Sequence, residues 1–316
     1  MGERGRSAKG VVFPPPHMPE DATHPEALVV PPKDKLPRHV GIIMDGNGRW
    51  AQARGVSRDQ GHSKGADAVR TVVRAARRLG LDALTLYAFS SQNWNRPPEE
   101  VVHLMRLLRR YLKDERAEIM DNRIRLRTIG DTDRLPAAVK EPLRALIKES
   151  SGNDGMILCL ALSYGGRETI VAAVRDVCRA VQAGELNVED IDEERFGDYI
   201  PSTKALPPLD LLIRTSGEQR ISNFFLWEVA YAELYFTSRL WPDYDRVALV
   251  QALVAYASRE RRYGRLPEQV TQLNPSLIVQ KLSPAARDVL ERALTDPNQR
   301  PAAVLEALAS GGKSGG

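Results

Sequence analysis

Apolar residues along the middle of the chain form short runs that predict buried strands. Runs of five to seven residues, each bounded by polar or turn-forming sequence, lie at 40–44, 83–89, 124–129, 156–162 and 209–213. Between them, apolar residues recur at helical spacing, and we expect helices at 63–79, 99–116, 136–149, 167–183 and 246–260. Ser63 is expected to cap the first helix and Gly80 to end it. This alternation favours an α/β fold with one mostly parallel sheet flanked by helices.

The periodic pattern is confined to a central domain, which we place at residues 36–270. Residues 1–35 contain seven prolines among Gly, Ser and charged residues, which predicts a disordered Pro-rich N-terminal tail. Residues 271–316 show weaker periodicity and end in a Gly- and Ser-rich stretch. We therefore expect a C-terminal extension that is partly helical and then flexible.

The composition, with 42% hydrophobic and 27% charged residues, is that of an ordinary folded protein. The two cysteines, Cys159 and Cys178, belong to no Cys-x-x-Cys or Cys/His cluster of the kind that binds zinc. No apolar run is long enough for a transmembrane helix, and the N-terminus lacks the apolar core of a signal peptide. We expect a cytoplasmic protein, and peripheral contact with a membrane remains open.

Positive charge is concentrated in one stretch. The whole chain carries a net charge of +4, whereas residues 38–78 contain nine Lys or Arg and three Asp, a local excess of +6. This excess predicts a local anion site. A nucleic-acid surface is the rival interpretation, but the arginines alternate with glycine turns and aspartate rather than with stacking aromatics.

Polar, turn-rich sequence follows three of the predicted strands. These segments are 45–49, 90–96 and 214–222. Ligands of parallel sheets bind beyond the carboxyl ends of the strands, so the three segments should converge on one site.

The first segment combines a carboxylate, two glycines and an arginine. In Asp45-Gly46-Asn47-Gly48-Arg49 the glycines would let backbone N–H groups close on an anion, which suits a diphosphate. The sequence matches neither a Walker A loop nor the Gly-x-Gly-x-x-Gly fingerprint, so neither ATP nor NAD is favoured. Arg58 and His62 enter the next helix and would strengthen the attraction for phosphate. An ordinary Asp-Gly turn is the alternative.

The third segment predicts a second anion-binding surface. Arg214 and Arg220 flank a glycine and hydroxyl donors, and guanidinium groups match phosphate oxygens. Two such surfaces indicate two phosphorylated substrates. Glu233 lies in an apolar and aromatic run, where an unpaired carboxylate is costly, so it needs a metal or a cation. Asp45 and Glu233 would suffice for Mg²⁺, which completes its shell with water and substrate phosphate.

Five blocks of this sequence closely resemble the cis-prenyltransferases, the undecaprenyl diphosphate synthase family. They are HVGIIMDGNGRW at 39–50, GH at 61–62, FSSQNWNR at 89–96, RTSGEQRISNF at 214–224, and Glu233. The resemblance extends over about residues 36–265 and leaves the two tails outside. It implies a six-stranded, mostly parallel sheet, a homodimer, and an Mg²⁺-dependent transferase. Such an enzyme adds isopentenyl diphosphate units in cis geometry to an allylic diphosphate such as farnesyl or geranyl diphosphate.

The resemblance also implies a product and roles for residues. The product would be a long-chain polyprenyl diphosphate such as undecaprenyl diphosphate, the precursor of the lipid carrier for cell-wall glycans. Asp45 would be the catalytic aspartate and a metal ligand, Glu233 the second metal residue, and Asn93 the proton acceptor. The residues implied for the allylic diphosphate are Gly46, Asn47, Gly48, Arg49, Trp50, Arg58 and His62. Those implied for isopentenyl diphosphate and the rest of the substrate site are Ser90, Ser91, Gln92, Trp94, Arg96, Arg214, Arg220, Ile221 and Ser222.

Several alternatives stay open at this point. An uncharged Asn is a poor base, so a diphosphate oxygen oriented by Asn93 competes as proton acceptor. Position 219 is Gln where some bacterial members have His, which puts any metal or cross-subunit role of that side chain in doubt. The helix from Glu99 carries a wide apolar band that suits either a hydrophobic tunnel between sheet and helices or burial on two sides. A shorter-chain synthase and a non-catalytic subunit are the alternative functions.

Overall fold

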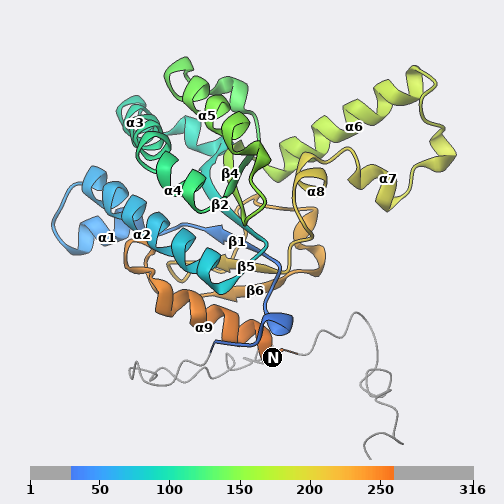
Figure 1. Cartoon of the computed structure of the whole chain (residues 1–316). Helices are drawn as coiled ribbons and strands as arrows, with labels where there is room; N and C mark the ends of the chain where they lie inside the picture. The colour runs from blue at the N-terminus through green and yellow to red at the C-terminus, as the bar shows by residue number, and fades with distance from the viewer. Residues whose placement is uncertain (1–29, 260–316) are drawn as a thin grey trace, which may run out of the picture. The chain divides into compact units, whose positions relative to one another are not determined.

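The computed structural model describes residues 30–259, through which a six-stranded sheet runs (Figure 1). The strands lie in the order β3 (Arg125–Ile129), β4 (Ile157–Tyr164), β2 (Ala83–Ser90), β1 (His39–Ile43), β5 (Leu211–Arg214) and β6 (Glu233–Phe236). Every neighbouring pair is parallel. The predicted α/β class with a mostly parallel, helix-flanked sheet is confirmed. The apolar runs located five strands, and only the resemblance implied a sixth. The sixth strand lies in the apolar and aromatic stretch 230–236, in which the charged Glu233 hides its start.

Alternate residues of each strand enter two separate hydrophobic cores. On one face, side chains such as Ile42, Leu86 and Leu160 pack against helices. Most of the helical residues of this core come from α2 (Arg58–Leu79), α3 (Pro98–Asp114), α5 (Ala137–Glu149) and α9 (Arg246–Ala257). On the other face, Cys159 and Leu212 belong to a core with Phe224 and its neighbours. Since both faces are covered, the strands read as continuous apolar runs.

The other elements connect these layers. The remaining helices are α1 (Asn47–Ala53), α4 (Arg116–Asp121), α6 (Gly166–Gln182), α7 (Glu193–Gly197) and α8 (Pro201–Ala205). Short 3₁₀ turns are η1 (Lys33–Lys35), η2 (Ser91–Asn95), η3 (Thr132–Arg134), η4 (Ser150–Gly152), η5 (Val188–Asp190), η6 (Glu228–Tyr231) and η7 (Trp241–Asp243). No helix within residues 30–259 is long and apolar enough to cross a membrane.

Helix α2 ends as expected but begins earlier than expected. Gly80 ends it with a left-handed φ of 79°. The expected cap at Ser63 is wrong, because Ser57 and Gln60 form a capping box that starts the helix at Arg58.

Two glycines of α2 let α1 lie directly on it. A Cβ atom at Gly61 would approach the Asn47 backbone oxygen to 2.4 Å, and one at Gly65 would approach the Asn47 Oδ1 to 2.4 Å. Any larger residue would push the two helices apart. The glycines therefore fix the position of Asn47 relative to His62.

Parts of the predicted tails lie outside the described residues. These are residues 1–29 of the N-terminal tail and 260–316, which include the C-terminal extension. The boundaries of the central domain at 36 and 270 stay predictions.

Buried His39 at the start of β1 should make stability depend on pH. Its Nδ1–H fits as donor to the Pro207 carbonyl at 2.9 Å, while Nε2 accepts from the Thr85 hydroxyl at 2.8 Å. Burial lowers its pKa to about 4. Between the unfolded value of about 6.5 and this folded value, only the unfolded chain binds the proton, so acidification favours unfolding.

We expect the free energy of unfolding to fall by about 2 kcal/mol from this group between pH 7 and pH 5. Denaturant titration at the two pH values measures it. The variant His39→Gln keeps one donor and one acceptor but does not titrate, so its loss should be smaller by that amount. Equal losses in the two proteins would contradict the assignment.

Candidate functional site

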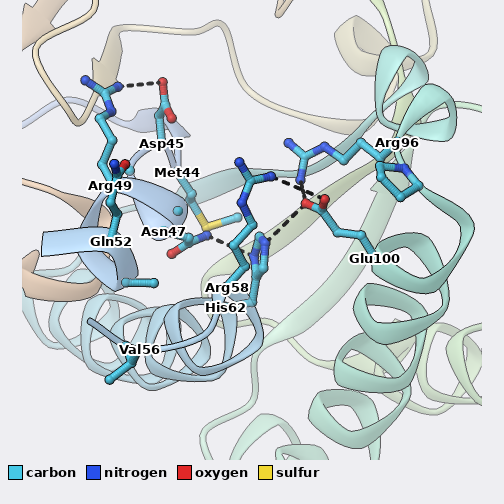
Figure 2. Close-up of a pocket in the computed structure, with 14 residues that line it drawn as sticks. Met44, Asp45, Asn47, Arg49, Gln52, Val56, Arg58, His62, Arg96 and Glu100 are labelled. Atoms are coloured by element: carbon cyan, nitrogen blue, oxygen red, sulfur yellow. Dashed lines mark hydrogen bonds and ion pairs between the residues drawn. The ribbon is translucent and has the colours of Figure 1, made fainter. Parts of the chain in front are cut away.

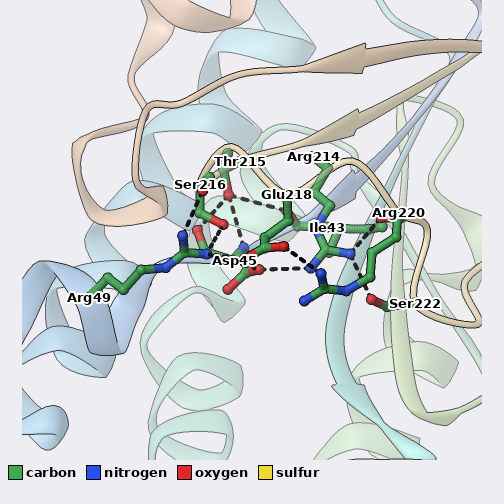
Figure 3. Close-up of polar contacts among 9 residues, drawn as sticks. All are labelled: Ile43, Asp45, Arg49, Arg214, Thr215, Ser216, Glu218, Arg220 and Ser222. Atoms are coloured by element: carbon green, nitrogen blue, oxygen red, sulfur yellow. Dashed lines mark hydrogen bonds and ion pairs between the residues drawn. The ribbon is translucent and has the colours of Figure 1, made fainter. Parts of the chain in front are cut away.

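A buried ion pair joins the ends of β1 and β5. Arg214, the last residue of β5, donates to Asp45 Oδ2 at 2.8 Å, and its side chain is only 4% exposed (Figure 3). The same guanidinium donates to the Arg220 carbonyl and to Ser222 Oγ at 2.5 and 2.6 Å. Arg214 thus fixes both the Asp45 carboxylate and the loop that follows β5.

The surroundings of Asp45 keep its carboxylate charged. Burial acts to raise its pKa, but hydrogen bonds from Arg214 and Ser216 and the positive charges of Arg214 and Arg49 outweigh burial, so the pKa lies below its ordinary value. Asp45 is an anion at neutral pH, and it is available to a cation or to a polarised group of a ligand.

Arg49 connects the first predicted segment with the third. It donates to the carbonyl and the hydroxyl of Ser216 at 2.8 and 2.6 Å, and Glu218 Oε1 lies 3.5 Å away (Figure 3). Glu218 also pairs with Arg220, whose side chain is 64% exposed. The loop holds strained backbone, since Ser216, Ser222 and Asn223 all have positive φ. Such strain clusters at functional sites.

A pocket of about 770 Å³ opens beside Asp45 (Figure 2). It is lined by α1, the start of α2 and the start of α3. The predicted residues that line it are Asp45, Gly46, Asn47, Gly48, Arg49, Arg58, His62 and Arg96. The first N–H groups of a helix lack partners within the helix, so α1 adds donors to this cationic wall.

Glu100 on α3 is the charged residue of this pocket that the sequence analysis missed. Its carboxylate lies 2.8 Å from Arg96, 3.5 Å from His62 and 3.6 Å from Arg58 (Figure 2). Burial first, and the charge of Arg96 second, lower the pKa of His62, so this imidazole is neutral at pH 7. Glu100 therefore acts as the counter-ion of the pocket arginines. The sequence did contain a signal for this pair, because Glu100 follows Arg96 by four residues at the start of a predicted helix, and such residues can form an ion pair.

The turn after β2 is bonded to the loop after β5 through Glu168 of α6. Ser91 Oγ and Asn223 Nδ2 donate to Glu168 at 2.7 and 2.8 Å, and Gln92 donates at 3.3 Å. Within η2, Ser90 and Asn93 form a capping box in which Asn93 Oδ1 accepts from the Ser90 N–H at 3.0 Å. The sequence analysis did not single out Glu168, because an acidic residue in the first turn of a helix is common.

Three predicted substrate residues point away from the pocket. The Trp50 indole donates to Asp243 at 2.8 Å, with Arg54 over its ring. The Trp94 indole donates to Ser163 at 2.9 Å and packs edge-on against Phe89. Ile221 packs on the second core. None of the three lines the pocket beside Asp45, and their place in the substrate site stays a prediction.

Asp45 and Glu233 do not meet within one chain, and their joint metal site stays a prediction. Glu233 begins β6 in register with Leu211, which in turn pairs with Val40 of β1. Asp45 lies five residues further along, beyond the opposite end of β1, or about 16 Å at the usual strand rise. Glu233 was expected to need a metal or a cation beside it, and Arg259 is that cation, since the two form an ion pair.

The Asp45 carboxylate, without Glu233, is still a suitable ligand for Mg²⁺. Within residues 30–259 no group of three or more acidic, His or Cys side chains is arranged to hold a metal ion. Mg²⁺ does not require such a cage, since it often takes one protein carboxylate, several waters and substrate phosphates. The ionised Asp45 beside a cationic pocket supplies that carboxylate.

A small apolar cavity adjoins the polar pocket. It has a volume of about 130 Å³, and Met44, Asn47 and His62 line both spaces. Its wall includes side chains of α3, namely Leu104, Leu107, Leu108 and Tyr111. This places an apolar space between α3 and the sheet, where the tunnel was expected. The exposed Val102 shows that the apolar band of α3 is not wholly directed inward.

Comparison with known proteins places this arrangement in one family. A family model described as undecaprenyl diphosphate synthase matches residues 43–264. An isoprenyl transferase of Geobacter sulfurreducens is 49% identical over 237 residues, which are 75% of this chain and 96% of the relative. A ditrans,polycis-undecaprenyl-diphosphate synthase of Vibrio parahaemolyticus, specific for (2E,6E)-farnesyl diphosphate, is 46% identical over 240 residues, 76% of this chain and 95% of the relative.

A solved structure resembles the chain as well. Lavandulyl diphosphate synthase from Lavandula x intermedia, crystallised in complex with dimethylallyl diphosphate, aligns with a TM-score of 0.71 and 39% identity. The alignment covers 73% of this chain and 100% of that one.

Removal of the Glu100 charge should strengthen anion binding. The variant Glu100→Gln frees Arg58 and Arg96 from their counter-ion, so inorganic pyrophosphate should bind about fivefold more tightly at low salt, as measured by calorimetry. The control Glu99→Gln removes the same charge one residue earlier, outside the pocket lining, and should change the affinity little. Equal or weaker binding by Glu100→Gln would contradict the counter-ion role.

Proposed function

We propose substrates, a product and residue roles for this chain, which belongs to the undecaprenyl diphosphate synthase family and is a cis-prenyltransferase. The proposed reaction adds isopentenyl diphosphate units to farnesyl or geranyl diphosphate and yields undecaprenyl diphosphate. The observation that carries it is the cationic pocket adjoining an apolar cavity, since a prenyl diphosphate needs both. A shorter-chain synthase is the alternative that the same site allows.

The allylic diphosphate is assigned to the pocket beside Asp45. Its oxygens would accept from the backbone N–H groups at the start of α1 and from the side chains that Glu100 neutralises in the free protein. Those side chains are Arg58 and Arg96; the neutral His62 lies beside them, and Arg49 lies at the opposite wall (Figure 2). The diphosphate therefore replaces Glu100 as their counter-ion, and its prenyl chain enters the apolar cavity.

Isopentenyl diphosphate is assigned to the neighbouring loops. Arg220 and Ser222 after β5, and the turn at 90–93 after β2, lie on segments that Arg214 and Glu168 hold together. Arg220 is the exposed arginine that can turn to a phosphate, because the Arg214 guanidinium already serves three acceptors. We assign Arg214 to positioning Asp45 and Ser222 rather than to direct contact alone.

The chain's residues favour departure of the allylic diphosphate. Breaking the allylic C–O bond leaves negative charge on the diphosphate, and preorganised N–H groups and arginines stabilise that charge. Mg²⁺, held by Asp45 and substrate phosphate, would add a Lewis acid there. The alkene of isopentenyl diphosphate supplies the electron pair for the new C–C bond, so it needs placement more than activation.

Loss of the final proton involves Asn93 as an orienting residue. Its Oδ1 already accepts from the Ser90 N–H, so the group that Asn93 presents is its amide NH₂, a donor. A donor cannot take the proton, but it can hold a diphosphate oxygen in place to do so. We therefore favour the diphosphate oxygen over Asn93 as the base.

Product length and assembly form the last part of the proposal. The cavity of about 130 Å³ is smaller than ordinary ligand sites of roughly 300–1,000 Å³, so a long product requires α3 to move away from the sheet. The sequence identity of 46% to a farnesyl-specific undecaprenyl diphosphate synthase supports a long product. We also propose a homodimer with Mg²⁺ as cofactor, as is typical of the family, acting in the cytoplasm with peripheral membrane contact on product release.

The first test of the function is synthesis by the purified chain alone. With farnesyl diphosphate, labelled isopentenyl diphosphate and Mg²⁺ in detergent, we expect a ladder of products that ends at a long polyprenyl diphosphate. The variant Asp45→Ala should lower the rate by roughly a hundredfold or more, since it removes a preorganised charge. A ladder that ends early would favour the shorter-chain synthase. No product from either farnesyl or geranyl diphosphate would favour the non-catalytic subunit.

Single-turnover condensation by Asn93 variants tests the proton step. Asn93→Ala removes the donor and should slow condensation by about ten- to a hundredfold. Asn93→Asp supplies a base but repels the diphosphate, so it should be at least as slow as Asn93→Ala. A restored or faster rate in Asn93→Asp would contradict the orienting role.

A further inference from the structure

Four cations form a stripe along the solvent face of α3. Arg106, Arg109, Arg110 and Lys113 are all exposed, and their spacing of three and four residues places them on one side of the helix. The stripe is about 10 Å long at the rise of an α-helix. In the described part of the chain, no ion pair involves any of the four.

Neighbouring carboxylates do not neutralise this stripe. Asp114 and Glu115 at the end of α3 both pair with Arg70 of α2, and Glu118 of α4 pairs with Arg74. Glu99, in the first turn of α3, and Asp114, four residues after Arg110, share the stripe's side of the helix, but Asp114 is paired with Arg70 and Glu99 lies seven residues before Arg106. The face therefore presents a net positive charge to solvent.

The opposite side of the same helix is the wall of the apolar cavity. Leu104, Leu108 and Tyr111 point inward to that space. Because a helix with its side chains is about 10–12 Å thick, the cavity lies roughly that far behind the cationic stripe. Val102 precedes the stripe by one turn on the same side and is 46% exposed, so an apolar side chain accompanies the charges.

We propose that this face of α3 docks on an anionic lipid bilayer. The inference rests on the proposed function in one respect, since a polyprenyl product behind α3 leaves into lipid. Cations on an amphipathic surface bind anionic headgroups, and the exposed Val102 can enter the headgroup region. Proteins that bind single-stranded nucleic acid add aromatic side chains on which bases stack, and this stripe has none, so a lipid surface is the favoured partner. Docking places α3, which forms a wall of the cavity, against the membrane.

Vesicle co-sedimentation of the full chain, without substrates, tests the surface. Wild type should bind vesicles of equal parts phosphatidylglycerol and phosphatidylcholine, and binding should weaken with added salt and vanish on pure phosphatidylcholine. The double variant Arg106→Gln/Arg110→Gln should bind about thirtyfold more weakly, from roughly fivefold per cation. Arg175→Gln/Arg246→Gln removes two exposed charges on α6 and α9 and is the matched control; it should bind nearly as well as wild type.

Three results would overturn the assignment. They are absence of wild-type binding to anionic vesicles at low salt, an equal loss in the two double variants, and retention on single-stranded RNA in place of vesicles. As a control, both double variants should unfold at the same midpoint temperature as wild type, which would show that their fold is intact. Condensation in detergent is measured separately and should be unchanged in both double variants. Failure of condensation in wild type therefore counts against the proposed function, and failure of vesicle binding counts against this surface.

Discussion

The ion pair between Arg214 and Asp45 is the interaction on which the site depends. A guanidinium that is 4% exposed has lost most of its hydration, and this loss is compensated only if its donors find acceptors. Asp45, the Arg220 carbonyl and Ser222 accept from its two terminal nitrogens, while its buried Nε has no acceptor among the described residues. One buried cation thereby fixes a carboxylate after β1 and a strained loop after β5. Removal of Asp45 would leave the Arg214 charge buried without its counter-ion, whereas Asp45 is 33% exposed and has Arg49 as a second cation at 3.6 Å.

The remaining acidic residues of the site act as internal counter-ions. Glu100 holds the arginines of the pocket, Glu218 holds Arg220, and Glu168 holds the turn after β2. In each case the carboxylate keeps a cationic or donor group in place before any anion arrives. The arrangement reduces the reorganisation that substrate binding requires, at the cost of competition between carboxylate and diphosphate. Because of this competition, the pocket arginines have two alternative partners: Glu100 before the diphosphate binds, and the diphosphate afterwards.

The sequence predicted those features that depend on residues close together in the chain, and missed those that depend on contacts between remote residues. The five strands in short apolar runs, the helix end at Gly80 and the cradle at 45–49 depend on neighbouring residues, and all were located. Helix α1 was missed because Asn-Gly reads as a turn, and only the contact with Gly61 and Gly65 shows why a helix lies there. Trp50 and Trp94 were placed in the substrate site by the family resemblance, whereas the partners of their indoles, Asp243 and Ser163, are remote in sequence and follow only from the packed structure.

The sequence by itself determined the family, the α/β class and the segments that carry the chemistry, because these are set by residue type and by spacing along the chain. Tertiary structure alone decided which charges meet. Strand order places Asp45 against Arg214, 169 residues apart in sequence, whereas strand register separates Asp45 from Glu233 and gives Glu233 to Arg259. Charge pairing depends on distance in space, and a distance of a few ångströms between remote residues is a property of the packed sheet, not of any local pattern.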